Sequence, residues 1–133
     1  MPSTLTIFDE TTGGARGEAL ELTFPDEEIT VRELIRERVY QEVKDHNARR
    51  ASEPIFRGLV QPTDAEATLN GYKLKRPRMI EWEPQFEQAL AAFERNQVLV
   101  LVNNRQVDGL DEVIQVRPRT EVVFLKLMPL VGG

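Results

Sequence analysis

The sequence contains no cysteine and only one histidine, His46. Without cysteine the chain has no disulfide bond, no thiolate metal ligand and no cysteine nucleophile. His46 has no second histidine with which to share a metal ion, and it lies near the end of a helical pattern, where a polar or cationic side chain interacts favourably with the helix dipole. We therefore expect a structural histidine and no metal site.

Long apolar runs and an excess of positive charge are also absent. The longest apolar run, Val98–Val102, is far shorter than the roughly 20 residues that span a membrane. The N-terminal sequence MPSTLTIFDE lacks the basic flank and the apolar stretch of a secretory signal. The formal net charge of -5 argues against a broad nucleic-acid surface. These features predict a soluble, cytoplasmic protein that binds neither membranes nor nucleic acids.

The 133 residues suffice for one domain, and the first third of the chain has a regular pattern. Apolar and polar residues alternate over 4–10 and again over 18–24, which is typical of half-buried strands joined by a hairpin loop. Thr30 and Glu33 then have the spacing of a helix capping box. Apolar residues that follow at helical spacing predict a helix that covers one face of a sheet: Val31, Leu34, Ile35, Val39 and Val43.

The middle of the chain, residues 48–96, is rich in proline and glycine and predicts a loop-rich insertion. Helical spacing returns near its end and predicts a second helix at about 85–96. The apolar stripe of this helix consists of Phe86, Ala89, Leu90 and Phe93. Trp82 is expected to pack with the aromatic residues of the stripe.

The last third of the chain predicts a hairpin and a final strand. The run Val98–Val102 is typical of a buried central strand, and the asparagine pair after it favours a turn. Residues 121–128 form the last predicted strand, on which Val122 and Phe124 are expected to face the core. The order of all elements predicts an α+β fold, with a mixed sheet of about four to five strands and a helix across one face. The other face of the last strand is also apolar and is expected to be covered by the insertion or to form a partner surface: Val123, Leu125 and Leu127.

The C-terminal sequence VLVLVNNRQVDGLDEVIQVRPRTEVVFLKLMPLVGG resembles ubiquitin-like β-grasp proteins, especially the sulfur carriers related to the molybdopterin-synthase small subunit. Their pattern is an aliphatic strand, a short Asn-containing turn, Val-Asp, a loop, a charged residue before Val-X-Phe, and a terminal Gly-Gly. Residues 102–108, residues 121–124 and the pair Gly132-Gly133 match that order. The resemblance implies one β-grasp domain over 1–133, with an insertion at 48–96. The large insertion and a longer tail make the chain more similar to bacterial ubiquitin-like modifiers than to the carriers.

The resemblance also implies a chemistry for the chain end. In this family an activating enzyme uses ATP and magnesium to adenylate the C-terminal carboxylate, so Gly133 is implied as the site of adenylation and covalent attachment. Glycine has no Cβ and fits a narrow channel, while Pro129 removes a ladder donor and ends strand pairing. The flexible tail over 129–133 would therefore enter the activating enzyme: Pro129, Leu130, Val131, Gly132 and Gly133.

Partners are implied in the same way: an activating enzyme, a conjugating enzyme, a deconjugating peptidase and target proteins. Leu125 and Leu127 are the residues that we expect to contact the activating enzyme. The chain has no nucleotide-binding loop and no catalytic thiol, so we expect a substrate of these enzymes rather than an enzyme, with no cofactor bound to the chain itself.

Two other functions are open at this point. A sulfur carrier would convert the adenylated Gly133 to a thiocarboxylate, and the similarity of VNNRQVD and EVVFL to the carriers favours it. A non-covalent interaction module with a β-grasp fold would have no use for the terminal glycines, which would then be an ordinary chain end.

Overall fold

The computed structural model describes residues 3–14, 16–17, 19–49, 55–56, 59–60, 65–67, 72–74 and 80–127. The chain divides into two compact units, the first made of Met1–Leu34 and Ala92–Gly133 and the second of Ile35–Ala91. It passes from the first unit to the second within helix α1 (Val31–Arg49) and returns within helix α2 (Trp82–Glu94). The predicted insertion at 48–96 overlaps the second unit, and its exact boundaries stay a prediction.

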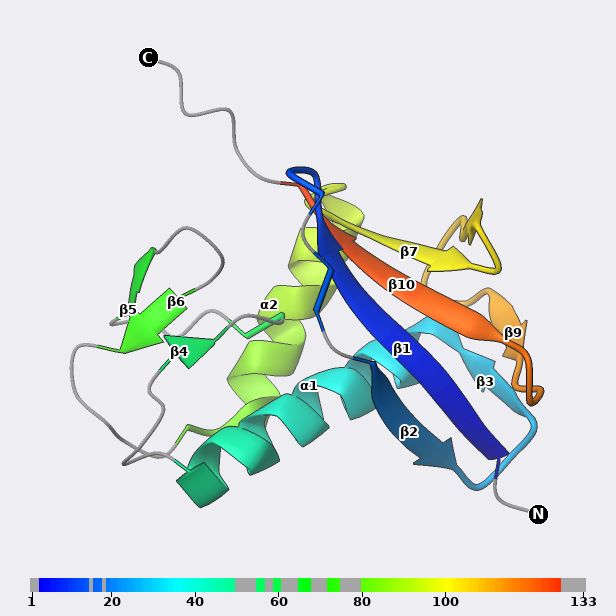
Figure 1. Ribbon diagram of the computed structural model, residues 1–133, viewed down its shortest axis with the longest axis horizontal. Coiled ribbons are helices and arrows are strands. Elements are labelled where there is room, and N and C mark those ends of the chain that lie inside the picture. The colour runs from blue at the N-terminus through cyan, green and yellow to red at the C-terminus, as the bar shows by residue number, and fades with distance from the viewer. Residues whose placement is uncertain are drawn as a thin grey trace. The chain divides into compact units, whose positions relative to one another are not determined.

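The first unit contains a five-stranded mixed sheet (Figure 1). Its strand order is β2-β1-β10-β7-β8, and β10 is parallel to β1 and antiparallel to β7. A separate ribbon pairs β3 with β9. The predicted α+β class with a mixed sheet is therefore confirmed. The strands of this unit are β1 (Ser3–Thr11), β2 (Leu20–Phe24), β3 (Glu28–Thr30), β7 (Val98–Val102), β8 (Arg105–Gln106), β9 (Val113–Gln115) and β10 (Glu121–Lys126).

Alternation along the strands decides which side chains form the core of this unit. Val122 and Phe124 of β10 are both 0% exposed, which confirms their predicted core positions. Their register partners on β7, Val102 and Val100, lie on the same face, as does Ile7 of β1 opposite Val122. Further buried apolar side chains of this unit are Leu5, Leu22, Phe24, Ile29, Val31, Leu34, Val98, Val107, Leu110, Ile114 and Val116.

One strand assignment was wrong. The apolar run over Val98–Val102 was expected to be the central strand, but β10 holds that place, and β7 is bordered by β8, which has two residues. Leu99 and Leu101 are only half-buried, because they lie on the face of the sheet opposite the core. A continuous aliphatic run indicates burial but does not define strand order, because the order depends on pairing between distant segments.

The start of α1 shows why the helix begins at Val31. The Thr30 hydroxyl accepts a hydrogen bond from the amide of Glu33 at 3.1 Å and lies 3.3 Å from the Glu33 carboxylate, to which it donates. The carbonyls of Glu112 and Leu110 accept hydrogen bonds from the amides of Val31 and Arg32, both at 3.0 Å. Three of the otherwise unsatisfied N–H groups of the first turn thus have partners, and the predicted capped start is confirmed.

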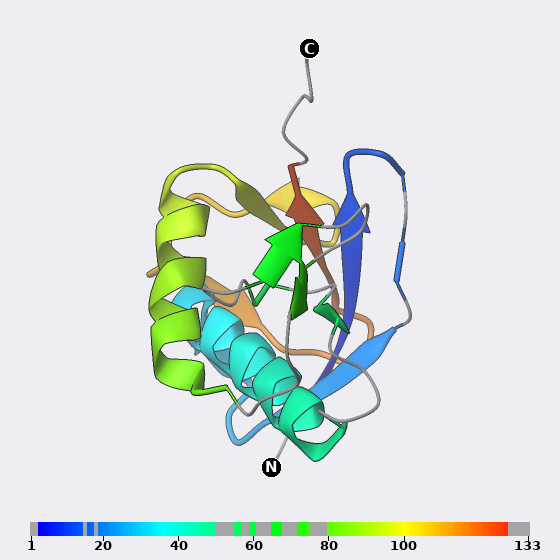
Figure 2. The same cartoon turned by 90° about the vertical axis from the view of Figure 1, so that its left-hand side faces the viewer.

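The second unit contains the rest of α1, most of α2 and a small sheet with the order β4-β6-β5 (Figure 2). The second helix was predicted, but it begins and ends slightly earlier than the expected 85–96. The three strands were not predicted, because segments of two or three residues are too short to show a period. They are β4 (Ile55–Phe56), β5 (Ala65–Ala67) and β6 (Tyr72–Leu74).

Two side chains of α1 hold the chain that follows it within the second unit. The Glu42 carboxylate accepts hydrogen bonds from the amides of Leu59, at 2.7 Å, and Val60, at 3.4 Å. The Asn47 amide makes a matched pair with the backbone of Ile80, at 2.8 Å to its N–H and 2.9 Å to its carbonyl. Leu59, Val60 and Ile80 are all buried, so these bonds are shielded from water.

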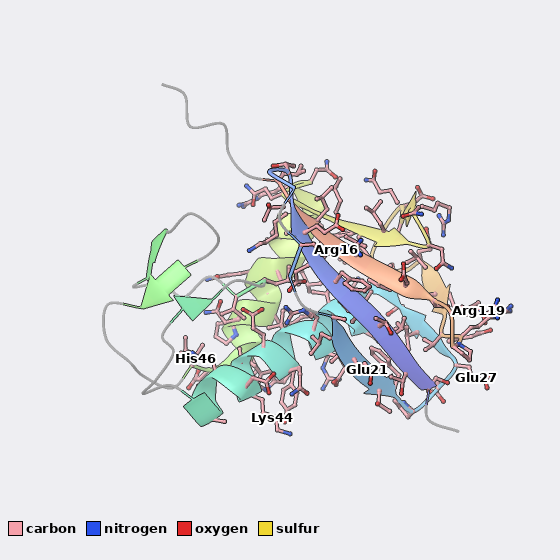
Figure 3. All side chains as sticks on the ribbon, viewed as in Figure 1. Arg16, Glu21, Glu27, Lys44, His46 and Arg119 are labelled. Carbon is pink, nitrogen blue, oxygen red and sulfur yellow. The ribbon has the colours of Figure 1, made fainter. Side chains whose placement is uncertain are left out.

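The aromatic residues of the second unit join its helices. The Trp82 ring of α2 meets Tyr40 of α1 edge-on at 5.6 Å between centroids, and it lies 6.1 Å from the Phe86 ring. Trp82 thus packs with Phe86, as expected. His46 is 5% exposed within α1, in agreement with a structural role (Figure 3 labels it).

Candidate functional site

The predicted reactive tail lies outside the described residues. Pro129, Leu130, Val131, Gly132 and Gly133 all follow Leu127, the last residue that the structure describes. The structure therefore bears on the base of the tail and on the sheet beside it.

The base of the tail is fixed to both neighbouring parts of the sheet. The carbonyl of Lys126 accepts a hydrogen bond from the amide of Thr12 at 3.2 Å, just beyond β1. The amide of Leu127 donates to the carbonyl of Gln97 at 2.9 Å, just before β7. Because β10 is the central strand, the chain reaches Leu127 with backbone anchors on either side, and the Leu127 side chain is 39% exposed.

The face of the sheet opposite the core is also apolar beside β10. Register places Leu125 next to Leu99 of β7, and Val123 between Leu101 of β7 and Phe8 of β1. We refer to these five residues, Phe8, Leu99, Leu101, Val123 and Leu125, as the outer-sheet patch. Four of them are half-buried, and only Val123 is buried, at 7% exposure. Of the three predicted surface residues, Leu125 and Leu127 thus offer accessible area, whereas Val123 lies between larger neighbours and offers little.

A charged pair borders the outer-sheet patch. The Arg16 guanidinium lies over the Phe8 ring, 4.3 Å from its centroid, and forms an ion pair with Glu10. Glu10 is the register partner of Leu125 on β1, so the pair lies at the side of the patch. A half-buried apolar centre with a polar border is the usual composition of a protein interface.

A second feature lies at the start of β10, within the same unit. A depression of about 380 Å³ is lined by Val102, Asn103, Arg105, Val113, Ile114, Gln115, Arg117 and Thr120. Arg105 forms an ion pair with Glu112 at 2.6 Å, and the amide of Asp108 donates to the same carboxylate at 3.0 Å. The Arg105 hydrogen bond, followed by that from Asp108, holds the pKa of Glu112 below its ordinary value, and Glu112 in turn raises the pKa of Arg105.

Sequence reasoning missed Phe8, Leu99 and Leu101 as members of the apolar face. A signal was present for Phe8, because it follows Thr4 and Thr6 on the otherwise polar face of the first strand. Leu99 and Leu101 were assigned to a doubly buried strand. The depression had no local signal, since its walls come from several segments of the last third of the chain.

The described residues include no candidate metal site and no candidate membrane-spanning helix. This part of the chain contains no group of three or more His, Asp or Glu side chains that could hold a metal ion. Neither of its two helices is long and apolar enough to cross a membrane.

Comparisons with protein-family models, with curated proteins and with solved structures found no match to the chain.

Proposed function

We propose that this protein is a ubiquitin-like modifier with a β-grasp fold, whose Gly133 carboxylate is adenylated by an activating enzyme and then joined to target proteins. The observation that carries the proposal is the position of β10. It is the central strand, parallel to β1, and the Gly132-Gly133 pair follows shortly after it in the sequence. The antiparallel β1–β2 and β7–β8 pairs on either side, and a capped helix in the first half, support a β-grasp arrangement.

Activation would use the terminal carboxylate as a nucleophile. It attacks the α-phosphate of ATP in the partner enzyme, pyrophosphate leaves, and the resulting mixed anhydride is open to attack by an amine, with AMP as the leaving group. The five residues 129–133 span roughly 16 to 18 Å when extended, which is long enough to enter an active site while the folded unit docks outside. In this proposal ATP and magnesium belong to the partner, and the chain itself is not an enzyme.

The outer-sheet patch and Leu127 are the surface that we assign to docking of the activating enzyme. They lie beside the base of the tail, and Leu125 is half-buried on the solvent face of β10. We expect Leu125→Arg to reduce activation, because it places a charge in the apolar centre of the interface. ATP–pyrophosphate exchange with the activating enzyme measures this, and unchanged exchange in a folded variant would contradict the docking surface.

The proposal as a whole is tested by mass spectrometry of an N-terminally tagged copy recovered from its native cells. Gly133 linked to lysines of other proteins is the expected result, and deletion of Gly132 and Gly133 should abolish the linkage. Replacement of one terminal oxygen by sulfur would instead establish a sulfur carrier, which the similarity of VNNRQVD and EVVFL to the carriers favours. A free carboxylate under every condition would refute both, and would leave a non-covalent interaction module.

A further inference from the structure

The depression at the start of β10 is bordered by an open strand edge. In the antiparallel β3–β9 ribbon, only every second residue of β9 directs its backbone hydrogen bonds toward β3. The Glu112 carbonyl accepts from the Val31 amide, the Val116 amide donates to the Glu27 carbonyl, and Ile114 lies midway between them, opposite Ile29. The backbone groups of Val113 and Gln115 therefore point to the other edge. The Gln115 carbonyl shows this directly, since it accepts a hydrogen bond from the Thr120 hydroxyl at 3.1 Å.

That edge borders the depression, because Val113 and Gln115 are among the residues that line it. Val102, Asn103 and Arg105 from the β7–β8 hairpin also line it. The Val113 side chain is 51% exposed, which is the largest exposure among the big apolar residues of the described chain. The Gln115 carbonyl is already used by Thr120, so the edge presents the amide and carbonyl of Val113 and the amide of Gln115 to another strand, with apolar surface beside them. Such backbone groups next to apolar surface are the requirements for addition of a peptide strand.

The charges at the depression decide which peptide would fit. Arg105 also lines the depression, but it is already paired with Glu112. Arg117 lines the depression and forms no ion pair with any residue in the described ranges. The nearby Glu28 carboxylate accepts a hydrogen bond from the Gln115 side chain at 2.9 Å. An unpaired arginine beside an apolar strand edge favours a ligand with both aliphatic and acidic side chains.

We propose that the depression between β9 and the β7–β8 hairpin binds a short extended segment of a partner protein, which pairs with the Val113 edge and places a carboxylate on Arg117. Aliphatic side chains of the segment contact Val102 and Val113. This interaction does not depend on the terminal glycines, and its failure would leave the proposed chemistry of the tail untouched.

The test uses the full chain and a capped pentapeptide of alternating valine and glutamate, followed by NMR of the backbone amides. Saturable shifts at Val113, Gln115 and Asn103 are expected. Arg117→Glu should weaken binding about tenfold, because a charge-assisted hydrogen bond is lost and like charges meet. Arg119→Glu is the matched control. This arginine lies in the same turn, projects outward (Figure 3) and does not line the depression, so its replacement should change the affinity less than about twofold.

Two further peptides test the charge contact and the strand pairing separately, and they require no variant of the protein. The analogue with lysine in place of glutamate should bind much more weakly, and methylation of the central backbone amide should abolish binding because it blocks strand pairing. The proposal is overturned by the absence of saturable shifts, by equal binding of the lysine peptide, or by equal effects of Arg117→Glu and Arg119→Glu. Concentration-dependent shifts at Val113 without peptide would overturn it in favour of self-association of the chain.

Discussion

The Glu42 contact with the segment after α1 can be tested by removing its carboxylate. Glu42 is 11% exposed at its side chain, and its oxygens accept hydrogen bonds from the amides of Leu59 and Val60 and from the Arg38 guanidinium. Glu42→Ala deletes these acceptors in a place that water does not easily reach. Glu37→Ala is the matched control, because Glu37 is a half-buried glutamate of the same helix.

The expected magnitude follows from the shortest of these bonds. A hydrogen bond to a charged group contributes about 1.5 to 3 kcal/mol, and the 2.7 Å bond from Leu59 belongs to this class. The Val60 and Arg38 contacts are both 3.4 Å and add less. We therefore expect Glu42→Ala to destabilise the anchored segment by about 3 kcal/mol, which corresponds to roughly a hundredfold faster opening.

Hydrogen exchange measures this opening directly. The amides of Leu59 and Val60 should exchange roughly a hundredfold faster in Glu42→Ala, while Glu37→Ala should leave them within about twofold of the original rate. Glu42→Gln keeps one acceptor oxygen and should fall between the two. Unchanged protection of Leu59 in Glu42→Ala, or equal acceleration in the control, would refute the assignment of Glu42 as the anchor.

Three other outcomes follow from the first unit. Thr30→Ala should lower the free energy of unfolding in urea by about 1 kcal/mol, and Thr30→Ser should restore most of it, because serine caps a helix as well. Phe124→Ala should cost about 3 to 5 kcal/mol, whereas Leu127→Ala, at an exposed position beyond the same strand, should cost less than about 0.5 kcal/mol. Arg105→Gln should raise the pKa of Glu112 toward its ordinary value in an NMR titration, and an unchanged value would contradict the ion pair. The pKa of Glu112 is lowered in the folded state, so its ionised form stabilises the fold above the ordinary glutamate pKa of about 4.3. This stabilisation is lost as the pH falls through the pKa of the folded state. The difference in free energy of unfolding between the original chain and Arg105→Gln should therefore shrink as the pH is lowered through that range.

Local signals accounted for the principal elements of the first unit. Alternation identified β1, β2 and the two faces of β10, and the Thr30 spacing located the start of α1, because each depends on residues that are neighbours in the chain. The position of β7 in the sheet was misjudged because it depends on residues far away in the sequence. Its apolar content was read correctly, but its place between β10 and β8 is set by the strands that pair with it.

Some features of the candidate site could likewise be predicted from the sequence, and others depend on contacts between distant segments. The terminal Gly-Gly pair and the alternating apolar residues of the last strand are visible in the sequence. The burial of Val123 was not visible, since it results from Phe8 and Leu101 on two different strands. The anchoring by Glu42 and Asn47 joins side chains of α1 to backbone groups well beyond the helix, and no sequence period encodes such a pair.

The sequence by itself determined the secondary-structure type of the long elements, the capped start of α1 and which side of each long strand is apolar, because the physical causes are short-range sterics, capping and side-chain alternation. Only the tertiary structure decided that β10 is central and parallel to β1, that β9 pairs with β3, and that Val113 faces a depression beside Arg117. These features arise from hydrogen bonds and packing between segments far apart in the chain, whose pairing depends on the loops that bring them together.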